Sequence, residues 1–273
     1  MAEQEQPREE VLFGGVANAG AVVRVGEHVL RPSNPHSRAI HAYLRALRDA
    51  GFEGACCPVG IDPDGRERLE YVPGDVPVSP YPEWARSDAA LVSVARLLRR
   101  MHDAVPAFDP SGRAWSTELA DPTPTAGTSG TVMSHSDVCL ENVVFRNGEA
   151  VAILDFDFVA PGRRTYDVAA LARMCVPIDD DVNMARQGWL AVDRPARLRM
   201  VADTYGLDAD GRAEVLECLT ATFAKGGEFV RRRAEAGEPG FVQMWADMGG
   251  QERFDRRRRW WADARPTFEK AMA

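Results

Sequence analysis

Residues 131–157 read TVMSHSDVCLENVVFRNGEAVAILDFD, and this stretch decides how the rest of the chain is interpreted. Polar side chains occur in it in a defined order: His135-x-Asp137-x-x-x-x-Asn142, then Asp155-Phe156-Asp157. Carboxylates can accept a proton, and carboxylate and amide oxygens are ligands that a hard divalent cation prefers. The stretch therefore combines a candidate base with candidate metal ligands.

An apolar hairpin separates the two halves of this pattern. Residues 142–145 and 151–154 predict strands, and Asn147-Gly148 between them is a preferred hairpin turn. Either half alone is a short motif of the kind that matches by chance. One alternative is that the polar residues only form turns at strand ends, but turn formation does not require this order and spacing.

The chemistry that needs such a set is phosphoryl transfer from ATP. Asp137 suits the task of orienting a hydroxyl nucleophile and accepting its proton. Asn142 and Asp155 suit the task of holding Mg²⁺ against the β- and γ-phosphates. We therefore expect ATP and Mg²⁺ as cofactors.

The composition is that of a globular protein with one two-lobed domain or two small ones. The chain has 273 residues, of which 45% are hydrophobic and 27% charged. No apolar run has membrane-spanning length, and the polar start MAEQEQPREE is unlike a signal peptide. We expect a cytoplasmic protein with no membrane partner and a disordered segment at 1–10. The five cysteines lack metal-ligand spacing and predict reduced thiols.

The net charge of −8 argues against a nucleic-acid partner. It is compatible with a cationic substrate, although solubility alone also favours a net charge. Lys225 and Lys270 are the only lysines, so every basic side chain before residue 225, other than histidine, is an arginine. We expect a monomer.

The N-terminal third predicts a small β-rich lobe. Gly26-Glu27 reads as a tight hairpin turn, and Gly51 as a helix stop. Short strands are expected at 11–13, 21–25, 28–31, 56–61 and 66–72, with one helix at 37–50. The expectation is an antiparallel sheet of five strands with one helix.

The remainder predicts a larger helical lobe. Residues 73–82 are rich in proline and read as a connector, and 106–130 read as a loop. Helices are expected at 87–104, 167–174, 194–205, 210–234, 241–248 and 252–272.

This order of elements, together with the motif, resembles the aminoglycoside phosphotransferase family of small-molecule kinases. The resemblance covers roughly residues 11–235 and is strongest at 131–170. It implies an α+β, bilobal, protein-kinase-like fold. In that fold, 11–72 form the nucleotide-binding N-lobe, 73–82 the hinge, and 83–273 the helical C-lobe with the catalytic loop and the acceptor site.

The resemblance also implies roles for the motif residues. Asp137 resembles the family's catalytic aspartate, and His135 the residue that supports its loop. Asn142 and Asp155 resemble the Mg²⁺ ligands, and Asp157 is a further candidate metal ligand.

The helix start Tyr166-Asp167-Val168-Ala169 resembles a second family motif. Asp167 can brace the catalytic loop by accepting its N–H groups, or it can act only as a helix N-cap, and both alternatives stay open.

Two further segments correspond to the family's nucleotide site. The loop at 14–20 contains Gly14, Gly15 and Gly20, which permit close backbone approach to phosphates. The stretch 70–74 resembles the adenine-binding hinge, with main-chain groups near Glu70 and Val72 facing the adenine edge.

The chain departs from the family where a lysine normally contacts the α- and β-phosphates. No lysine is available, and Arg31 is the expected replacement, with Arg24 as a second candidate. The usual glutamate on the helix is also missing, so we expect His41 or Asp49 to take its place.

Only 158–165 separate Asp157 from the helix start, which is too short for the peptide platform of a protein kinase. Candidate walls of the acceptor site are 179–181, the helix around 229–235, and 245–261. The arginine runs 231–233 and 256–259 would repel a polycationic drug.

We therefore expect an ATP- and Mg²⁺-dependent O-phosphotransferase acting on a small hydroxylated molecule. The acceptor would be an aminoglycoside, another antibiotic, an amino alcohol, a sugar or a biosynthetic intermediate. The alternative is a kinase-like nucleotide-binding protein without catalysis.

Overall fold

The computed structural model describes residues 9–12, 15–18, 20–125, 130–189 and 192–273. Its N-terminal part is one antiparallel sheet with the strand order β1-β2-β3-β5-β4. The strands are β1 (Glu10–Val11), β2 (Val23–Val25), β3 (His28–Pro32), β4 (Pro58–Ile61) and β5 (Arg66–Glu70). The five-stranded sheet agrees with the sequence prediction, except that β1 begins at Glu10, within the segment expected to be disordered. Residues 1–8 and Phe13 lie outside the described residues.

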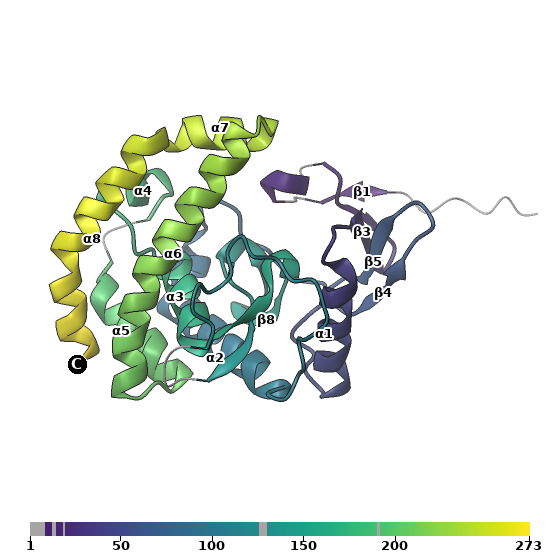
Figure 1. Ribbon diagram of the computed structural model, residues 1–273, viewed down its shortest axis with the longest axis horizontal. Helices are drawn as coiled ribbons and strands as arrows, with labels where there is room; N and C mark the ends of the chain where they lie inside the picture. The colour runs from purple at the N-terminus through teal and green to yellow at the C-terminus, as the bar shows by residue number, and fades with distance from the viewer. Residues whose placement is uncertain (1–8, 13–14, 19, 126–129, 190–191) are drawn as a thin grey trace, which may run out of the picture.

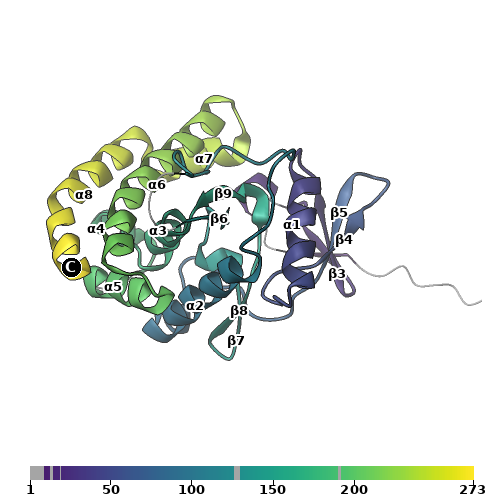
Figure 2. The same cartoon turned by 60° about the horizontal axis from the view of Figure 1, so that its bottom comes forward.

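Helix α1 (Ser37–Asp49) packs on this sheet and turns toward the rest of the molecule (Figure 2). Its expected apolar face is buried, with Ile40, Tyr43, Leu44 and Leu47 each at most 3% exposed. The Tyr43 ring meets the ring of Phe156, which lies in the motif stretch, at a centroid distance of 6.3 Å. The helix therefore joins the sheet to the segment that carries the candidate site.

The larger part is helical and lies on the other side of the molecule (Figure 1). Helices α2 and α5 begin as expected, because the side chains of Ser87 and Asp193 accept the exposed N–H groups of their first turns. The helices are α2 (Asp88–Ala104), α3 (Arg164–Cys175), α4 (Asp181–Arg186), α5 (Arg194–Tyr205), α6 (Ala209–Glu235), α7 (Pro239–Met248) and α8 (Gly250–Met272). Within the described residues, no helix is long and apolar enough to cross a membrane.

Two small sheets of two strands each lie between these parts. Strand β7 (Val143–Arg146) pairs with β8 (Glu149–Ile153), which is the predicted hairpin. Strand β6 (Thr131–Ser134) pairs with β9 (Ala160–Arg163), which the sequence did not predict. The β6–β9 pairing closes the motif stretch into a loop, since its two ends meet in one sheet.

All five cysteines are free, and four of them are buried, as expected for reduced thiols. Sequence patterns missed helix α4, because six residues are too few to show helical periodicity. They also placed α3 at 167–174, whereas the helix runs from Arg164 to Cys175.

Figure 1 shows α7 reaching back toward the N-terminal sheet, next to the short 3₁₀ turn η1 (Val16–Asn18). Gly240 of α7 packs so closely there that a Cβ atom would lie 3.0 Å from the carbonyl oxygen of Val16. The two lobes therefore touch at a second place, away from the connector.

The connector itself is anchored by backbone pairing. Asp75 exchanges two hydrogen bonds with Phe145 of β7, with N···O distances of 2.9 and 2.8 Å. Gly74 precedes this pair with a φ angle of 149°. A Cβ atom on Gly74 would lie 2.5 Å from Val144 and 2.6 Å from the Phe145 carbonyl oxygen, so only glycine fits.

We predict that Gly74→Ala lowers the free energy of unfolding by about 3 kcal/mol, because the methyl group must displace the β7 backbone and the φ angle is unfavourable for alanine. Urea unfolding followed by circular dichroism would measure this. Gly60→Ala is the control, because the space around its Cβ position is open. Equal stabilities of the two variants would contradict the prediction.

Candidate active site

Arg31 is the charged side chain that joins the two lobes. It projects from β3, and its guanidinium contacts three carboxylates. The Nε atom lies 2.5 Å from Glu67 Oε2, Nη1 lies 3.1 Å from Asp155 Oδ1, and Nη2 lies 2.6 Å from Asp157 Oδ1. Burial alone would lower the pKa of Arg31, but the three carboxylates raise it above its ordinary value. The structure thus places Arg31 at the predicted metal-ligand carboxylates.

Arg24, the second candidate for this position, lies elsewhere. Its guanidinium stacks on the Tyr71 ring at 3.9 Å and bonds to the Gly26 carbonyl oxygen. The sequence offered both arginines as candidates for the phosphate-binding position. In the structure, Arg31 contacts Asp155 and Asp157, whereas Arg24 contacts Tyr71 and Gly26.

Glu67 of β5 is the acidic partner that the sequence analysis missed. Its side chain is fully buried and contacts both Arg31 and the His41 imidazole, whose Nε2 lies 3.1 Å from Oε1. Burial works to raise the pKa of Glu67, but His41 and Arg31 lower it to about 2. His41 therefore stands behind Glu67 rather than beside Arg31. The only available signal was the pairing of Glu67 with Arg31 across adjacent strands.

Asp137 and Asn142 lie side by side at the end of the catalytic-loop motif. The Asn142 Nδ2 atom donates to the Asp137 carbonyl oxygen at 3.0 Å and approaches its carboxylate at 3.5 Å. Burial raises the pKa of Asp137, and the nearby charge of Arg173 opposes this shift most strongly. The carboxylate is therefore partly withdrawn from water and faces a cation.

His135 holds the motif loop through contacts of both ring nitrogens. Its Nε2 atom lies 2.8 Å from the Leu154 carbonyl oxygen, directly before Asp155, and its Nδ1 accepts the Asp137 N–H at 3.3 Å. Its ring also packs edge-on against Phe156, with centroids 4.8 Å apart. One imidazole thereby links the two halves of the motif.

Asp167 braces the loop and does not cap its helix. Its carboxylate accepts the N–H groups of His135 and Ser136 at 2.7 and 2.8 Å, and His102 Nε2 lies 2.9 Å away. The N-cap residue of α3 is Arg163, without a side-chain cap. Burial raises the pKa of Asp167, but the hydrogen bonds and histidines lower it below its ordinary value. Of the two alternatives left by the sequence, the geometry matches loop bracing.

The predicted metal ligands form a set that fits Mg²⁺. Asn142 directs its NH₂ group to Asp137, which leaves its amide oxygen available, and Asp155 and Asp157 each contact Arg31 through Oδ1, which leaves Oδ2. Within the described residues, no group of three His, Cys, Asp or Glu side chains is close enough to hold a metal ion. Mg²⁺ typically takes one or two protein carboxylates and completes its shell with phosphate oxygens and water. The residues present fit that mode.

The predicted glycine loop lies over this set. A Cβ atom on Gly15 would be 3.8 Å from Asp155 Oδ2, so the loop backbone passes directly above the carboxylate. Gly20 is exposed and has a φ angle of 77°. Gly14 lies outside the described residues.

The predicted hinge stretch has some main-chain groups that are already paired and one donor that is not. The Glu70 and Tyr71 N–H groups donate to Cys57 and Glu27, while Val72 N–H has no hydrogen-bond acceptor among the parts of the chain that the structure describes. Glu70 directs its carboxylate away, to Arg48. Val72 N–H is therefore a free donor among the described residues, at a position that the sequence analysis assigned to the hinge.

The carboxylates expected to line the acceptor site are already neutralised. Asp179 Oδ2 accepts from Arg253 at 2.9 Å, and Asp180 Oδ1 from Arg256 at 2.9 Å. Of the candidate tryptophans, Trp261 is 5% exposed and belongs to the core, while Trp245 stacks on Phe254 near the surface. Asp179 and Asp180, which the sequence offers as candidate wall residues, thus already pair with arginines of this chain.

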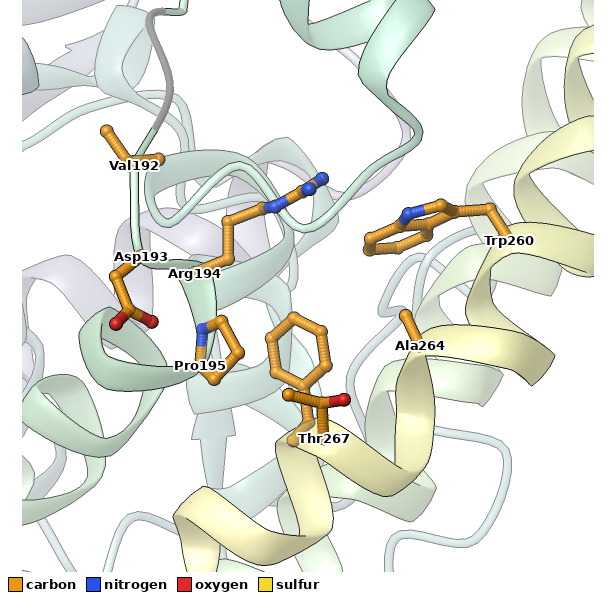
Figure 3. A pocket seen from close by; sticks show the side chains of 8 residues that line it. Val192, Asp193, Arg194, Pro195, Trp260, Ala264 and Thr267 are labelled. Atoms are coloured by element: carbon orange, nitrogen blue, oxygen red, sulfur yellow. The ribbon is translucent and has the colours of Figure 1, made fainter.

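A pocket of about 380 Å³ lies between the start of α5 and helix α8 (Figure 3). The Arg194 guanidinium lies over the Trp260 ring at 4.9 Å, and Pro195 and Phe268 also line the pocket. None of the predicted catalytic, metal or nucleotide-binding residues lines this pocket. It is separate from the candidate site.

We predict that Glu67→Gln flattens the dependence of stability on pH in acid. The pKa of Glu67 falls from 4.5 to about 2 on folding, so its contribution is fully present above 4.5 and is lost as pH falls through about 2. The free energy of unfolding of the wild type should therefore drop more steeply than that of the variant between these values. Urea unfolding at a series of pH values would measure both slopes, and parallel slopes would count against the prediction.

Sequence comparisons identify relatives. A profile of the phosphotransferase enzyme family (APH) matches residues 113–201, which contain the motif stretch. The chain is 31% identical over 207 residues to the trifolitoxin immunity protein of Rhizobium leguminosarum bv. trifolii, covering 74% of this chain and 76% of that protein.

Solved structures share the fold at low sequence identity. The amicoumacin kinase hAmiN, in complex with AMP-PNP, Ca²⁺ and Ami, has a TM-score of 0.63 at 14% identity and covers 84% of this chain and 82% of its own. A choline/ethanolamine kinase family protein from Mesorhizobium loti has a TM-score of 0.60 at 17% identity, covering 93% and 92%. The gentamicin complex of APH(2″)-IIa has a TM-score of 0.59 at 13% identity, covering 90% and 93%. The fold is therefore the predicted bilobal, protein-kinase-like one, and the chain belongs to the phosphotransferase enzyme family (APH).

Proposed function

We propose that this phosphotransferase uses ATP and Mg²⁺ to phosphorylate a hydroxyl group of a small molecule. The observation that carries the proposal is the contact between Asp137 and Asn142, next to the Asp155 carboxylate beneath the glycine loop. These groups provide a base, metal ligands and a phosphate cover in one place.

In the proposed reaction, Asp137 accepts a hydrogen bond from the acceptor hydroxyl and takes its proton. The acceptor oxygen forms a bond to the γ-phosphorus while the bond from that phosphorus to the β–γ bridging oxygen breaks, and ADP leaves with the electron pair. His135 and Asp167 position Asp137 by holding the loop backbone. Such positioning contributes through orientation and not through contact with the substrate.

Asn142, Asp155 and Asp157 are the residues that would hold Mg²⁺, which supplies charge neutralisation at the transferred phosphate. Arg31 would contact the α- and β-phosphates in place of the family's lysine. Nη1 and Nη2 each keep one N–H group beyond those directed to Asp155 and Asp157, and these two groups can bind phosphate oxygens, while Glu67 fixes the direction of the guanidinium. Val72 N–H and Gly15 would meet the adenine edge and the phosphates.

One relative of this chain is named as an immunity protein for trifolitoxin. We propose that this chain likewise protects a cell from a small antimicrobial by phosphorylating it. The similar solved structures include an amicoumacin kinase and a complex of gentamicin with APH(2″)-IIa, but these two are only 13–14% identical to this chain. They therefore leave the acceptor of this chain open.

We predict that Asp137→Asn lowers the rate of phosphate transfer about 10³-fold, because the amide cannot take the hydroxyl proton. Mass spectrometry of a panel of hydroxylated antibiotics, amino alcohols and sugars incubated with ATP and Mg²⁺ would measure transfer. Asp263→Asn, an exposed change on α8, is the matched control and should keep the wild-type rate.

Chelation of Mg²⁺ should abolish transfer in the same assay. The alternative, a nucleotide-binding protein without catalysis, predicts ATP binding with no modified acceptor in the wild type. Transfer that persists in Asp137→Asn would show that Asp137 is not the base.

A further inference from the structure

Three arginines gather beside the candidate site and define what we call the arginine cluster: Arg173 of α3 with Arg253 and Arg257 of α8. The two residues of α8 are each 4% exposed. One carboxylate, Asp179, lies among them, with Oδ2 at 2.9 Å from Arg253 Nη2 and 3.7 Å from Arg257 Nη1. Among the described residues, Asp179 is the carboxylate for which the structure gives ion pairs with these two arginines of α8, and Arg257 reaches it only at the longer distance.

Arg257 shows the shortage of negative charge most clearly. Besides the 3.7 Å approach to Asp179, it donates to the Phe223 carbonyl oxygen at 3.3 Å. Its guanidinium lies over the rings of Phe223 and Phe254, at 4.9 and 5.1 Å. Burial lowers the pKa of Arg257 to about 9, and repulsion from Arg253 and Arg173 acts in the same direction. A further anion beside Arg257 would offset both the cost of burying its charge and the repulsion from the other two arginines.

Arg173 lies on the part of α3 that contacts the motif loop, since Cys175 Sγ of the same helix lies 3.8 Å from the Val138 carbonyl oxygen. Its Nε atom is buried, and across the described parts of the chain the structure gives its side chain no hydrogen bond or ion pair. Gly226 of α6 makes room for it, since a Cβ atom there would lie 2.3 Å from Nη1. Its charge acts on Asp137 and also on Arg253 and Arg257. Arg173 thus connects the proposed base with the two buried arginines.

The other acidic groups near the cluster already have partners. Asp180 accepts from Arg256 and from the first N–H groups of α4. Asp181 pairs with Arg194 on the outer side of α4. Asn183, which contacts both Arg253 and Asp179, is neutral. On the side of the motif loop, the structure gives the Arg173 guanidinium no hydrogen bond or ion pair within the described residues, and the carboxylate on which its charge acts there is that of Asp137.

We propose that the arginine cluster binds an anionic group of the acceptor, so that the substrate is a hydroxylated small molecule carrying a carboxylate or a phosphate. Guanidinium groups bind both anions in a bidentate way, and such bonds are strong when shielded from water. A polycationic acceptor would instead bring positive charge against three arginines. This inference rests on the proposed function, because it places the acceptor hydroxyl at Asp137.

The first experiment measures transfer to three groups of acceptors that differ in charge. Hydroxy acids and sugar phosphates form the anionic group, neutral sugars the second, and aminoglycosides with amino alcohols the cationic group. We expect the modified compounds to be anionic. Modification of cationic or neutral compounds alone would overturn the inference while leaving the proposed function intact.

The second experiment does not depend on turnover. Inorganic phosphate and malonate, which test the two anion types separately, are added to protein already saturated with Mg²⁺ and a non-hydrolysable ATP analogue. We expect at least one of them to raise the Tm above that in sodium chloride of equal ionic strength. If neither does so, the inference fails whether or not the chain transfers phosphate.

Substitutions in the arginine cluster test whether the anion-induced rise in Tm arises there. Arg173→Gln should remove at least half of the anion-induced rise in Tm and raise the KM for an anionic acceptor at least about tenfold. Arg173→Lys, which keeps the charge, should recover part of both. The matched control is Arg258→Gln on α8, whose side chain is 81% exposed, and it should behave as the wild type. Equal effects of Arg173→Gln and Arg258→Gln would overturn the assignment.

Discussion

The contact of one guanidinium with three carboxylates is the constraint on which the candidate site depends. Arg31 belongs to the N-terminal sheet, whereas Asp155 and Asp157 belong to the other lobe. Glu67 holds the guanidinium from behind, and its own carboxylate is held by His41. Without Arg31, three buried or partly buried carboxylates would repel one another across the lobe boundary. The relative position of the lobes at this point is therefore set by charge compensation, in addition to packing.

A second buried carboxylate fixes the opposite side of the site. Asp167 accepts two backbone N–H groups of the motif loop and is itself held by His102, whose other nitrogen lies 2.5 Å from the Tyr205 hydroxyl. The chain of contacts runs from α5 through α2 and α3 to the loop. Ser136 has a φ angle of 68°, an unfavourable conformation for a non-glycine residue, and its N–H bond to Asp167 holds it there. The helical core thus imposes the loop shape.

The sequence predicted those parts of the fold that depend on local pattern. The β7–β8 hairpin, the apolar face of α1 and the exact span of α5 follow from periodicity and turn chemistry. Strand β9 was missed because Ala160–Arg163 contains Pro161 and Gly162, which disfavour strands, and forms only by pairing with β6. The predicted boundaries of the lobes stay predictions.

The sequence likewise predicted some residues of the candidate site and missed others. The motif residues could be predicted because their order and spacing along the chain define the motif. Glu67 could not, because its role arises from a neighbouring strand, 36 residues away from Arg31 in the sequence. The ion-pair partners of Asp179 and Asp180 could not be predicted for a similar reason, since these arginines lie on α8. Contacts between distant segments decide which charges remain available.

The net charge of the protein and the charge of the arginine cluster have opposite signs, and the proposed recognition of an anionic acceptor depends on the cluster. The chain carries a formal charge of −8, which by itself is compatible with a cationic substrate. Exposed charges more than about 10 Å apart are largely screened at physiological salt, whereas buried charges are not. Arg253 and Arg257 are buried, and Arg173 extends their field toward Asp137. Recognition at this site should therefore follow the three arginines and not the overall composition.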